Sequence, residues 1–278
     1  MSKLHVPYIN HPVNHYCFDD VKSVIVCGDI HGDYNEIINK ICIQYAINNS
    51  VIIFAGDCGF GFHKYGYYEN VYNKNKARLN KCNNYLVFVR GNHDNPEYFN
   101  ETNIKFDRFM TIPDYSIVES CGHTILCIGG AVSIDRQDRI EKETKEFIKS
   151  QSYKNTHINV DKLSPTYWWK DELPVYNPDL LKEIYEICIV DTVITHTAPK
   201  FCEKISKDGV EYWFKKDKDL QDDLNKEREV LTSIYNDLKD NMQPLTHWYY
   251  GHFHQSWDSN IDGCYFHMLD INQLQEIR

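Results

Sequence analysis

The stretch Ser23-Val-Ile-Val-Cys-Gly-Asp-Ile-His-Gly32 decides the fold, because an apolar run ends there in a turn that carries two polar side chains. The run 23–27 has the length and the branched side chains of a buried strand. Asp29 and His31 are two residues apart, so both side chains can point the same way from one strand end. Apolar residues at helical spacing follow over 37–47, which is typical of a strand–turn–helix unit.

The same pattern returns twice in the first half of the chain. The apolar run 51–55 ends at Gly56-Asp57, and the run 85–89 is followed, after Arg90, by Gly91-Asn92-His93-Asp94. Buried apolar strands that alternate with helices are typical of an α/β fold in which the strand ends carry the chemistry.

The second half predicts shorter strands and one long helix. The expected strands are 115–119, 124–128, 191–195, 247–250, 256–260 and 264–269. The strand 191–195 leads into His196, and 247–250 leads into Gly251-His252-Phe253-His254. Residues 216–242 are charged with one apolar stripe at helical spacing, which predicts a helix packed on the body of the protein.

Composition and length indicate one globular domain over residues 1–278. Hydrophobic residues make up 42% and charged residues 25% of the chain, which excludes a disordered tail or a coiled coil. Residues 1–22 are polar and predict an irregular N-terminal arm, and about 200–245 predicts a helical insertion. No apolar run approaches the ~20 residues of a membrane helix. We expect no membrane partner.

The net charge and the arrangement of the cysteines limit which binding partners and which cellular compartment we expect. The formal net charge is 30 − 40 = −10, which repels a phosphate backbone at long range and argues against an extended nucleic-acid surface. The ten cysteines are scattered without a C-x-x-C pair, and the first residues lack the apolar region of a secretory signal. We therefore expect reduced thiols and a cytoplasmic protein.

Nitrogen and oxygen ligands collect at the expected strand ends. They are three carboxylates, one amide and five imidazoles: Asp29, Asp57, Asp94, Asn92, His31, His93, His196, His252 and His254. Each residue alone is weak evidence for a metal site, since Gly-Asp turns are common and a lone histidine is more often a hydrogen-bonded core residue. Together, without thiolate, they suit Mn²⁺, Fe²⁺ or Zn²⁺. Seven ligands exceed the four of a structural zinc and fit two divalent metal ions about 3.5–4 Å apart that share a carboxylate.

With these motifs in order, the chain resembles the calcineurin-like metallophosphoesterases, whose pattern is D-x-H, GD, GNH followed by D or E, H, and GHxH. The gaps also fit, with 57 − 31 = 26 and 92 − 57 = 35, and the match runs from Asp29 to His254. The resemblance implies a four-layer αββα sandwich with the site at the strand ends.

The resemblance also implies a role for each motif residue. One ion would be held by Asp29, His31, Asp57 and His254, and the other by Asp57, Asn92, His196 and His252. His93 would contact the phosphorylated substrate and protonate the leaving group, and Asp94 would orient His93 through its ring N–H. The implied activity is phosphate-ester hydrolysis by a hydroxide that bridges the ions, with phosphomonoesters slightly preferred. A phosphodiesterase or nucleotide pyrophosphatase is the alternative, and a non-catalytic scaffold of the same fold is a second.

The chain departs from the protein-phosphatase branch, which reads GDxxDRG at the second motif, and so lacks the phosphate-binding arginine there. It carries instead Gly129-Gly-Ala-Val-Ser-Ile-Asp-Arg136, then Arg139, Trp168, Trp169 and Glu172, similar to a bacterial and phage-type subgroup. Arg136 either contacts the substrate phosphate or forms a salt bridge with Asp135 or Glu172. The tryptophan pair favours core packing over a base-stacking platform. For Arg90 we expect a structural ion pair rather than a contact with substrate. For His63 we expect a position on the surface rather than in the substrate cleft.

Overall fold

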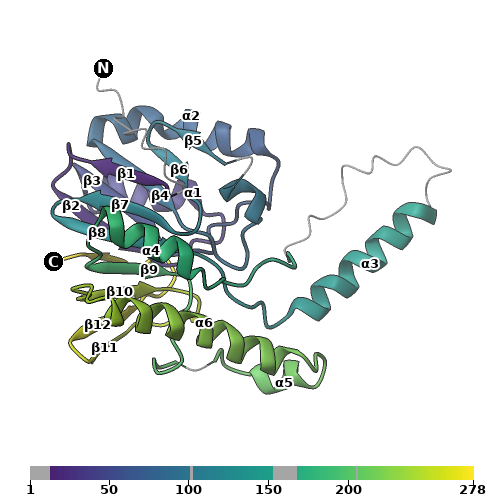
Figure 1. The fold of residues 1–278 in the computed structure, drawn as a ribbon. Helices are drawn as coiled ribbons and strands as arrows, with labels where there is room; N and C mark the ends of the chain where they lie inside the picture. Colours follow the sequence, from purple (N-terminus) through teal and green to yellow (C-terminus); the bar gives the residue numbers. More distant parts are fainter. Residues whose placement is uncertain (1–12, 101–102, 153–167, 205) are drawn as a thin grey trace.

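Two β-sheets stacked face to face form the centre of the protein (Figure 1). The structure is a computed structural model that describes residues 13–100, 103–152, 168–204 and 206–278. One sheet contains β2 (Ser23–Cys27), β3 (Ser50–Phe54), β4 (Asn84–Phe88), β5 (Lys105–Phe106), β6 (Phe109–Thr111) and β13 (Leu274–Glu276). The other contains β1 (His15–Phe18), β7 (Ser116–Ser120), β8 (His123–Ile128), β9 (Thr192–Thr195), β10 (His247–Tyr250), β11 (Trp257–Ile261) and β12 (Cys264–Met268).

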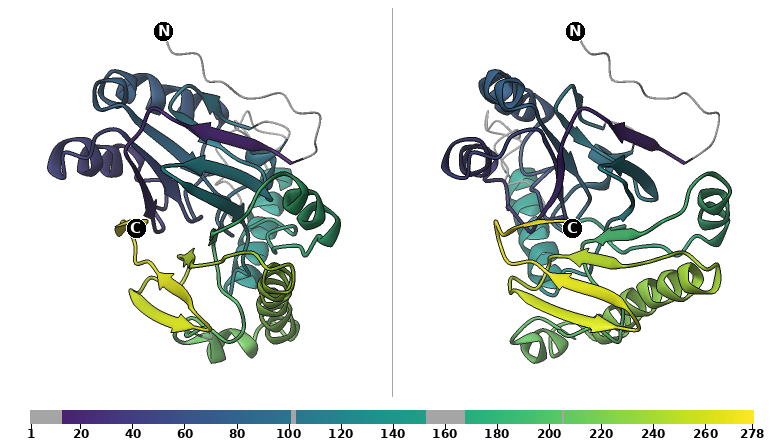
Figure 2. Two further views of the ribbon diagram at one scale, coloured as in Figure 1. Left: turned by 60° about the vertical axis from the view of Figure 1, so that its left-hand side comes forward. Right: turned by 90° about the vertical axis from the view of Figure 1, so that its left-hand side faces the viewer.

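Helices cover the outer faces of both sheets (Figure 2). The helical elements are α1 (Tyr34–Asn39) with a π-helical turn (Lys40–Gln44), α2 (Tyr65–Cys82), a 3₁₀ turn (Pro96–Phe99), α3 (Arg136–Ser152), α4 (Pro178–Ile187), α5 (Val210–Phe214) and α6 (Leu220–Asp240). Helices α1 and α2 pack on the six-stranded sheet, and α4 and α6 pack on the seven-stranded sheet. This order of layers confirms the expected αββα sandwich.

The alternation of side chains along the central strands explains the layers. In β3, Val51 and Ile53 enter the core between the sheets, whereas Ile52 and Phe54 face α1 and α2. Every residue of β3 is buried, and the strand is continuously apolar from Val51 to Phe54 rather than alternating. The continuous apolar runs seen in the sequence are thus strands covered on both faces.

Parallel pairing brings the functional strand ends to one edge. In the six-stranded sheet, order β13-β2-β3-β4-β6-β5, strands β2, β3 and β4 run parallel. In the seven-stranded sheet, order β1-β7-β8-β9-β10-β12-β11, strands β9 and β10 run parallel. The carboxyl ends of parallel strands meet at one edge, which is where ligands bind in α/β proteins.

Two regions differ from the sequence-based expectation. The N-terminal arm is not irregular throughout: residues 15–18 form β1, which pairs in parallel with β7 at the sheet edge. Its short alternation of polar and apolar residues was too brief to predict a strand, and residues 1–12 lie outside the described residues. The sequence also did not predict α3, which projects away from the sheets (Figure 1). The expected helical insertion at about 200–245 contains α5 and α6.

All ten cysteines are free in the structure. Among the described helices, none has both the length and the apolar composition needed to cross a membrane.

Candidate metal centre

The strand ends of both sheets deliver their polar side chains to one place. Asp29 follows β2, Asp57 follows β3, and Asn92 and His93 follow β4, all in the six-stranded sheet. The seven-stranded sheet contributes His196 directly after β9, and His252 and His254 after β10. The structure thereby brings together all seven residues that the sequence offers as metal ligands, with His93 beside them.

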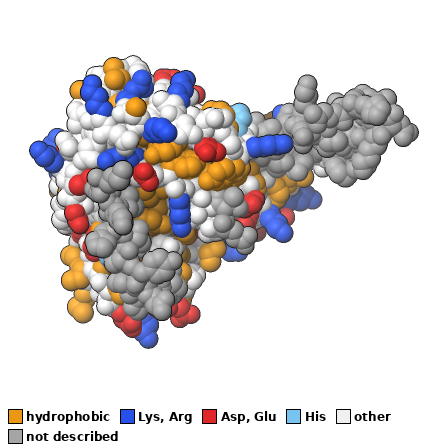
Figure 3. All heavy atoms as spheres, turned by 90° about the horizontal axis from the view of Figure 1, so that it is seen from above, with side chains coloured by type: hydrophobic (Ala, Val, Ile, Leu, Met, Phe, Trp, Pro, Cys, Tyr) orange, Lys and Arg blue, Asp and Glu red, His pale blue; other side chains and the backbone are white. Residues whose placement is uncertain are grey.

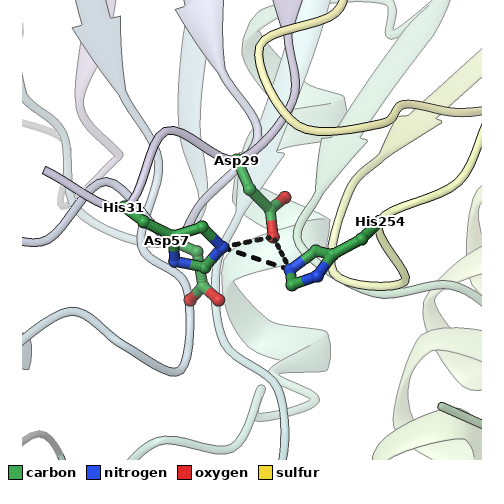
Figure 4. Close-up of side chains that lie close together, drawn as sticks. All are labelled: Asp29, His31, Asp57 and His254. Atoms are coloured by element: carbon green, nitrogen blue, oxygen red, sulfur yellow. Dashed lines mark hydrogen bonds and ion pairs between the residues drawn. The ribbon is translucent and has the colours of Figure 1, made fainter. Parts of the chain in front are cut away.

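A first cluster is formed by Asp29, His31, Asp57 and His254, whose ligand atoms all lie within 4.8 Å of one another (Figure 4). Asp29 Oδ2 lies 3.1 Å from His254 Nε2 and 3.8 Å from His31 Nε2. The two imidazole Nε2 atoms are 3.1 Å apart. Three ligand atoms thus converge on one point from two turns, the one after β2 and the one after β10.

A second cluster is formed by Asp57, His196 and His252, again within 4.8 Å of one another. Asn92 Oδ1 joins it at 3.1 Å from His196 Nε2, and Asp57 Oδ1 lies 3.2 Å from the same nitrogen. Asp57 belongs to both clusters and is the carboxylate that connects them.

The two central carboxylates show the same pattern of hydrogen bonding. Asp29 Oδ1 accepts the backbone N–H of His252 at 3.0 Å, and Asp57 Oδ1 accepts that of His93 at 2.8 Å. The Oδ2 atom of each is buried without a hydrogen-bond partner. Leaving such an oxygen unsatisfied is costly, so the pattern fits a cation held by the two Oδ2 atoms.

His196 is oriented as a ligand. Its Nδ1 lies 2.7 Å from the carbonyl oxygen of Ala55, so Nδ1–H donates there and Nε2 faces Asp57 and Asn92. Burial opposes a charged imidazole, but the carboxylates of Asp57 and Asp29 outweigh it and raise the pKa of His196 to about 9. The field at Nε2 therefore favours positive charge, supplied by a proton or by a metal ion.

Four of the ligand residues share a left-handed backbone conformation. His31, Asp57, His252 and His254 have positive φ angles of 44°, 49°, 69° and 54°. Residues other than glycine rarely adopt this left-handed conformation, and such strain persists mainly at functional sites. The sequence gives no direct signal for it.

A comparison with known proteins agrees with this geometry. The sequence profile described as calcineurin-like phosphoesterase matches residues 22–256, most of the chain. The chain belongs to this family. Family membership and the two ligand clusters support a metal-binding phosphoesterase hydrolase.

Solved structures that are similar to this phosphoesterase have low sequence identity to it. TT1561 from Thermus thermophilus has a TM-score of 0.52 and 11% identity, covering 93% of this chain and 99% of that one. A dimetal phosphatase from Danio rerio has a TM-score of 0.46 and 11% identity, covering 91% and 88%. Comparison with curated proteins finds no match.

His93 lies at the rim of the phosphoesterase site. Its Nε2 is 3.9 Å from Asp57 Oδ2 and accepts a hydrogen bond from Arg139 Nη2 at 3.0 Å. Burial lowers the pKa of His93 to about 4, with Asp57 opposing this and the positive charges of Arg139 and Lys207 adding to it. The ring is therefore neutral at pH 7 in the absence of substrate. The sequence analysis gave Arg139 and Lys207 no role, although the arginine stands three residues after Arg136.

Asp94 does not orient the His93 ring as the resemblance implied. Its Oδ1 accepts the backbone N–H groups of Gly59 and Phe60, at 2.7 and 2.8 Å. Its Oδ2 accepts those of Gly91 and Cys58, at 2.8 and 3.1 Å. Four backbone donors occupy the carboxylate, which therefore joins the loops after β3 and β4 instead of contacting imidazole.

Arg136 forms a salt bridge, but with neither of the partners expected from the sequence. Its Nε lies 2.5 Å from Asp217 Oδ2 and its Nη1 lies 2.7 Å from Asp223 Oδ2, which joins α3 to the start of α6. Asp135 pairs instead with Arg139, at 2.9 Å. Two nitrogens of the Arg136 guanidinium, Nε and Nη1, are thus held by carboxylates.

Two buried glutamates position the ligands: Glu172, which the sequence offered only as a salt-bridge partner of Arg136, and Glu227, which it did not indicate. Glu172 accepts hydrogen bonds from the backbone N–H and the hydroxyl of Ser133, whose oxygen accepts the amide N–H of Asn92 at 2.9 Å. This fixes the Asn92 amide so that Oδ1 faces His196. Glu227 of α6 accepts the hydroxyl of Thr197, next to His196 in sequence.

The remaining candidates are structural or peripheral. Arg90 pairs with Asp114 at 2.8 Å, as expected for a structural ion pair. Trp168 and Trp169 are half-buried, and the adjoining Tyr167 lies outside the described residues. His63 is exposed, in agreement with its expected surface position.

We expect Arg136→Ala to lower the free energy of unfolding by about 3 kcal/mol, because it leaves the carboxylate of Asp217 buried without its partner. KM for a phosphate ester should stay unchanged. Urea denaturation and steady-state kinetics measure both quantities. Lys145→Ala removes an exposed ion pair with Glu141 on the same helix and is the control that should change neither.

Proposed function

We propose that this protein hydrolyses phosphate esters, preferring phosphomonoesters, with two divalent ions of the Mn²⁺, Fe²⁺ or Zn²⁺ type. The observation that carries the proposal is that Asp57 belongs to two ligand clusters at once. Asp29, His31, Asp57 and His254 would hold one ion, and Asp57, Asn92, His196 and His252 the other. When bound, such ions supply Lewis-acid activation of water and neutralise charge on the phosphoryl oxygens.

The substrate would approach from the side of His31, His93 and His254. Their side chains are 28%, 20% and 36% exposed, whereas Asp29, Asp57 and His196 are buried. His93 is placed to hand a proton to the leaving group. A bound phosphate would bring negative charge next to this imidazole and raise its pKa, which favours the protonated form.

Arg139 is our candidate for the phosphate contact in place of Arg136. It lies at the start of α3 with Nη2 beside His93, while its Nε is held by Asp135. Lys207 acts on His93 and His252 by its charge and adds a second cation at the same rim. A planar guanidinium suits two phosphoryl oxygens.

Arg139→Ala should lower kcat/KM for a phosphomonoester by about 10–150-fold, the equivalent of about 1.5–3 kcal/mol for a charge-assisted hydrogen bond. Its thermal stability should stay close to wild type, because Asp135 is partly exposed. Arg136→Ala is the matched control with the opposite profile, unstable but kinetically intact. Wild-type kinetics in Arg139→Ala would remove this residue from the substrate site.

The substrate class can be tested with the Mn²⁺-loaded protein and two nitrophenyl esters. We expect faster hydrolysis of the phosphomonoester than of the bis-nitrophenyl diester, and the reverse order would support a phosphodiesterase.

Acidic and basic side chains are interspersed on the face shown in Figure 3, and the net charge is −10. Both favour a discrete phosphorylated substrate over a long nucleic acid. The ten free thiols favour a reducing compartment such as the cytoplasm.

A further inference from the structure

A third group of ligand-type side chains lies far along the seven-stranded sheet, on its edge strand β1. His15 and Cys17 alternate with Tyr16 and Phe18, which enter the core between the sheets. His15 and Cys17 therefore share the opposite face of the strand. Glu119 of the neighbouring β7 lies directly across from Cys17 in the parallel register.

The distances from Glu119 to His15 and to Cys17 match two edges of a tetrahedral zinc site. His15 Nε2 lies 3.3 Å and Cys17 Sγ 3.8 Å from Glu119 Oε2, and all three atoms lie within 4.8 Å of one another. Bond lengths of about 2.0–2.1 Å to nitrogen and oxygen and about 2.3 Å to sulfur give tetrahedral edges of about 3.3 and 3.6 Å. We propose that His15, Cys17 and Glu119 bind one zinc ion, separate from the phosphoesterase centre, with the fourth position open to water.

The hydrogen bonding of His15 supports a missing cation. Its Nε2 is buried and has no hydrogen-bond partner, although Glu119 Oε2 is close by. The nitrogen and the oxygen thus approach each other without the alignment of a hydrogen bond. Asp29 Oδ2 and His254 Nε2 in the first cluster show the same relation, a buried oxygen without a hydrogen-bond partner 3.1 Å from an imidazole nitrogen.

The donor set distinguishes this site from the phosphoesterase centre. Thiolate, imidazole and carboxylate together select zinc, whereas the two central clusters contain no sulfur. Burial, with the negative charges of Glu119 and Asp19, raises the pKa of the Cys17 thiol to about 11. Zinc must displace that proton, so binding should release one proton and strengthen as pH rises.

Zinc bound here would fasten the edge strand to the sheet. Two ligands lie on β1 and the third on β7, and in the described part of the chain β1 has no strand on its other side. The inferred role is therefore structural. It does not depend on hydrolysis of any ester.

Cobalt(II) provides a direct test, because a cobalt–thiolate bond gives a charge-transfer absorption that nitrogen and oxygen ligands do not. The full-length protein, reduced and first loaded with Mn²⁺, is titrated with Co²⁺. We expect a thiolate band that reaches a plateau and is bleached by Zn²⁺. Cys17→Ser should abolish the band, and Cys121→Ser, which removes an exposed cysteine at the β7–β8 turn, should leave it intact.

Zinc affinity gives a second measurement on separate variants. Removing a group that hydrogen-bonds to a metal ligand typically costs about 10–100-fold in metal affinity, so loss of a ligand itself in His15→Ala or Cys17→Ser should cost at least about 100-fold. Ester hydrolysis by the Mn²⁺-loaded variants should match wild type. The proposal is overturned if wild type shows no thiolate band, if the band survives in Cys17→Ser, or if His15→Ala binds zinc as wild type does.

Discussion

Asp57→Asn should abolish phosphate-ester hydrolysis and remove most of the bound metal. The carboxylate connects both ligand clusters and its Oδ2 is buried without a hydrogen-bond partner, so the amide would weaken both ion sites together. Metal ions contribute several kcal/mol of transition-state stabilisation, so we expect a loss of at least about 10³-fold in kcat. Metal analysis of the purified variant and steady-state kinetics measure the two effects.

Asp191→Asn is the matched control, since Asp191 lies just before β9, at the opposite end of the strand that leads to His196. It should keep both ions and full activity. Chelation should inactivate the wild-type protein, and Mn²⁺ should restore it. Hydrolysis at the full rate by metal-free protein would refute the two-ion proposal.

His93→Ala should slow hydrolysis of an alkyl phosphate by about 10²–10⁴-fold, the usual contribution of a general acid. Its effect on nitrophenyl phosphate should be much smaller, because nitrophenolate is stable without a proton. A phosphoserine peptide and nitrophenyl phosphate, assayed on the same metal-loaded variant, give the comparison. Equal losses with both ions retained would reassign His93 to stabilising the phosphoryl oxygens.

Two further variants separate this role from indirect effects. His31→Ala should slow both substrates equally, through loss of metal. Asp94→Asn should not reproduce the leaving-group dependence, because the Asp94 carboxylate accepts four backbone N–H groups and none from the His93 ring. It should instead lower thermal stability, since the new amide places N–H groups against backbone donors.

Most of the fold could be predicted because its central strands are apolar on both faces. The expected strand 51–55 is β3 at 50–54, and 85–89 is β4 at 84–88. The expected helix 216–242 is shorter, with α6 over 220–240. Strands such as β5, with two residues, and β13, with three, carry no periodicity and form only because a longer strand lies beside them.

The candidate ligands could be predicted because they sit in short motifs at strand ends, where local sequence fixes position. The partners of Arg136 could not, since they depend on how α3 packs against residues some 80 positions away. The role of Asp94 could not be predicted either, because its hydrogen-bond partners are backbone N–H groups, which no pattern of residue types identifies. The link from Glu172 through Ser133 to Asn92 likewise exists only in three dimensions.

The left-handed backbone at His31, Asp57, His252 and His254 lowers the stability of the folded chain at the residues that the proposed activity needs. For L-amino acids this conformation costs about 1–2 kcal/mol per residue, a cost that glycine avoids. His31→Gly should therefore make the metal-free chain more resistant to urea while destroying the ligand cluster. A screen for thermostable variants would find stabilising substitutions at these positions, and each of them would remove a metal ligand and with it the hydrolytic activity.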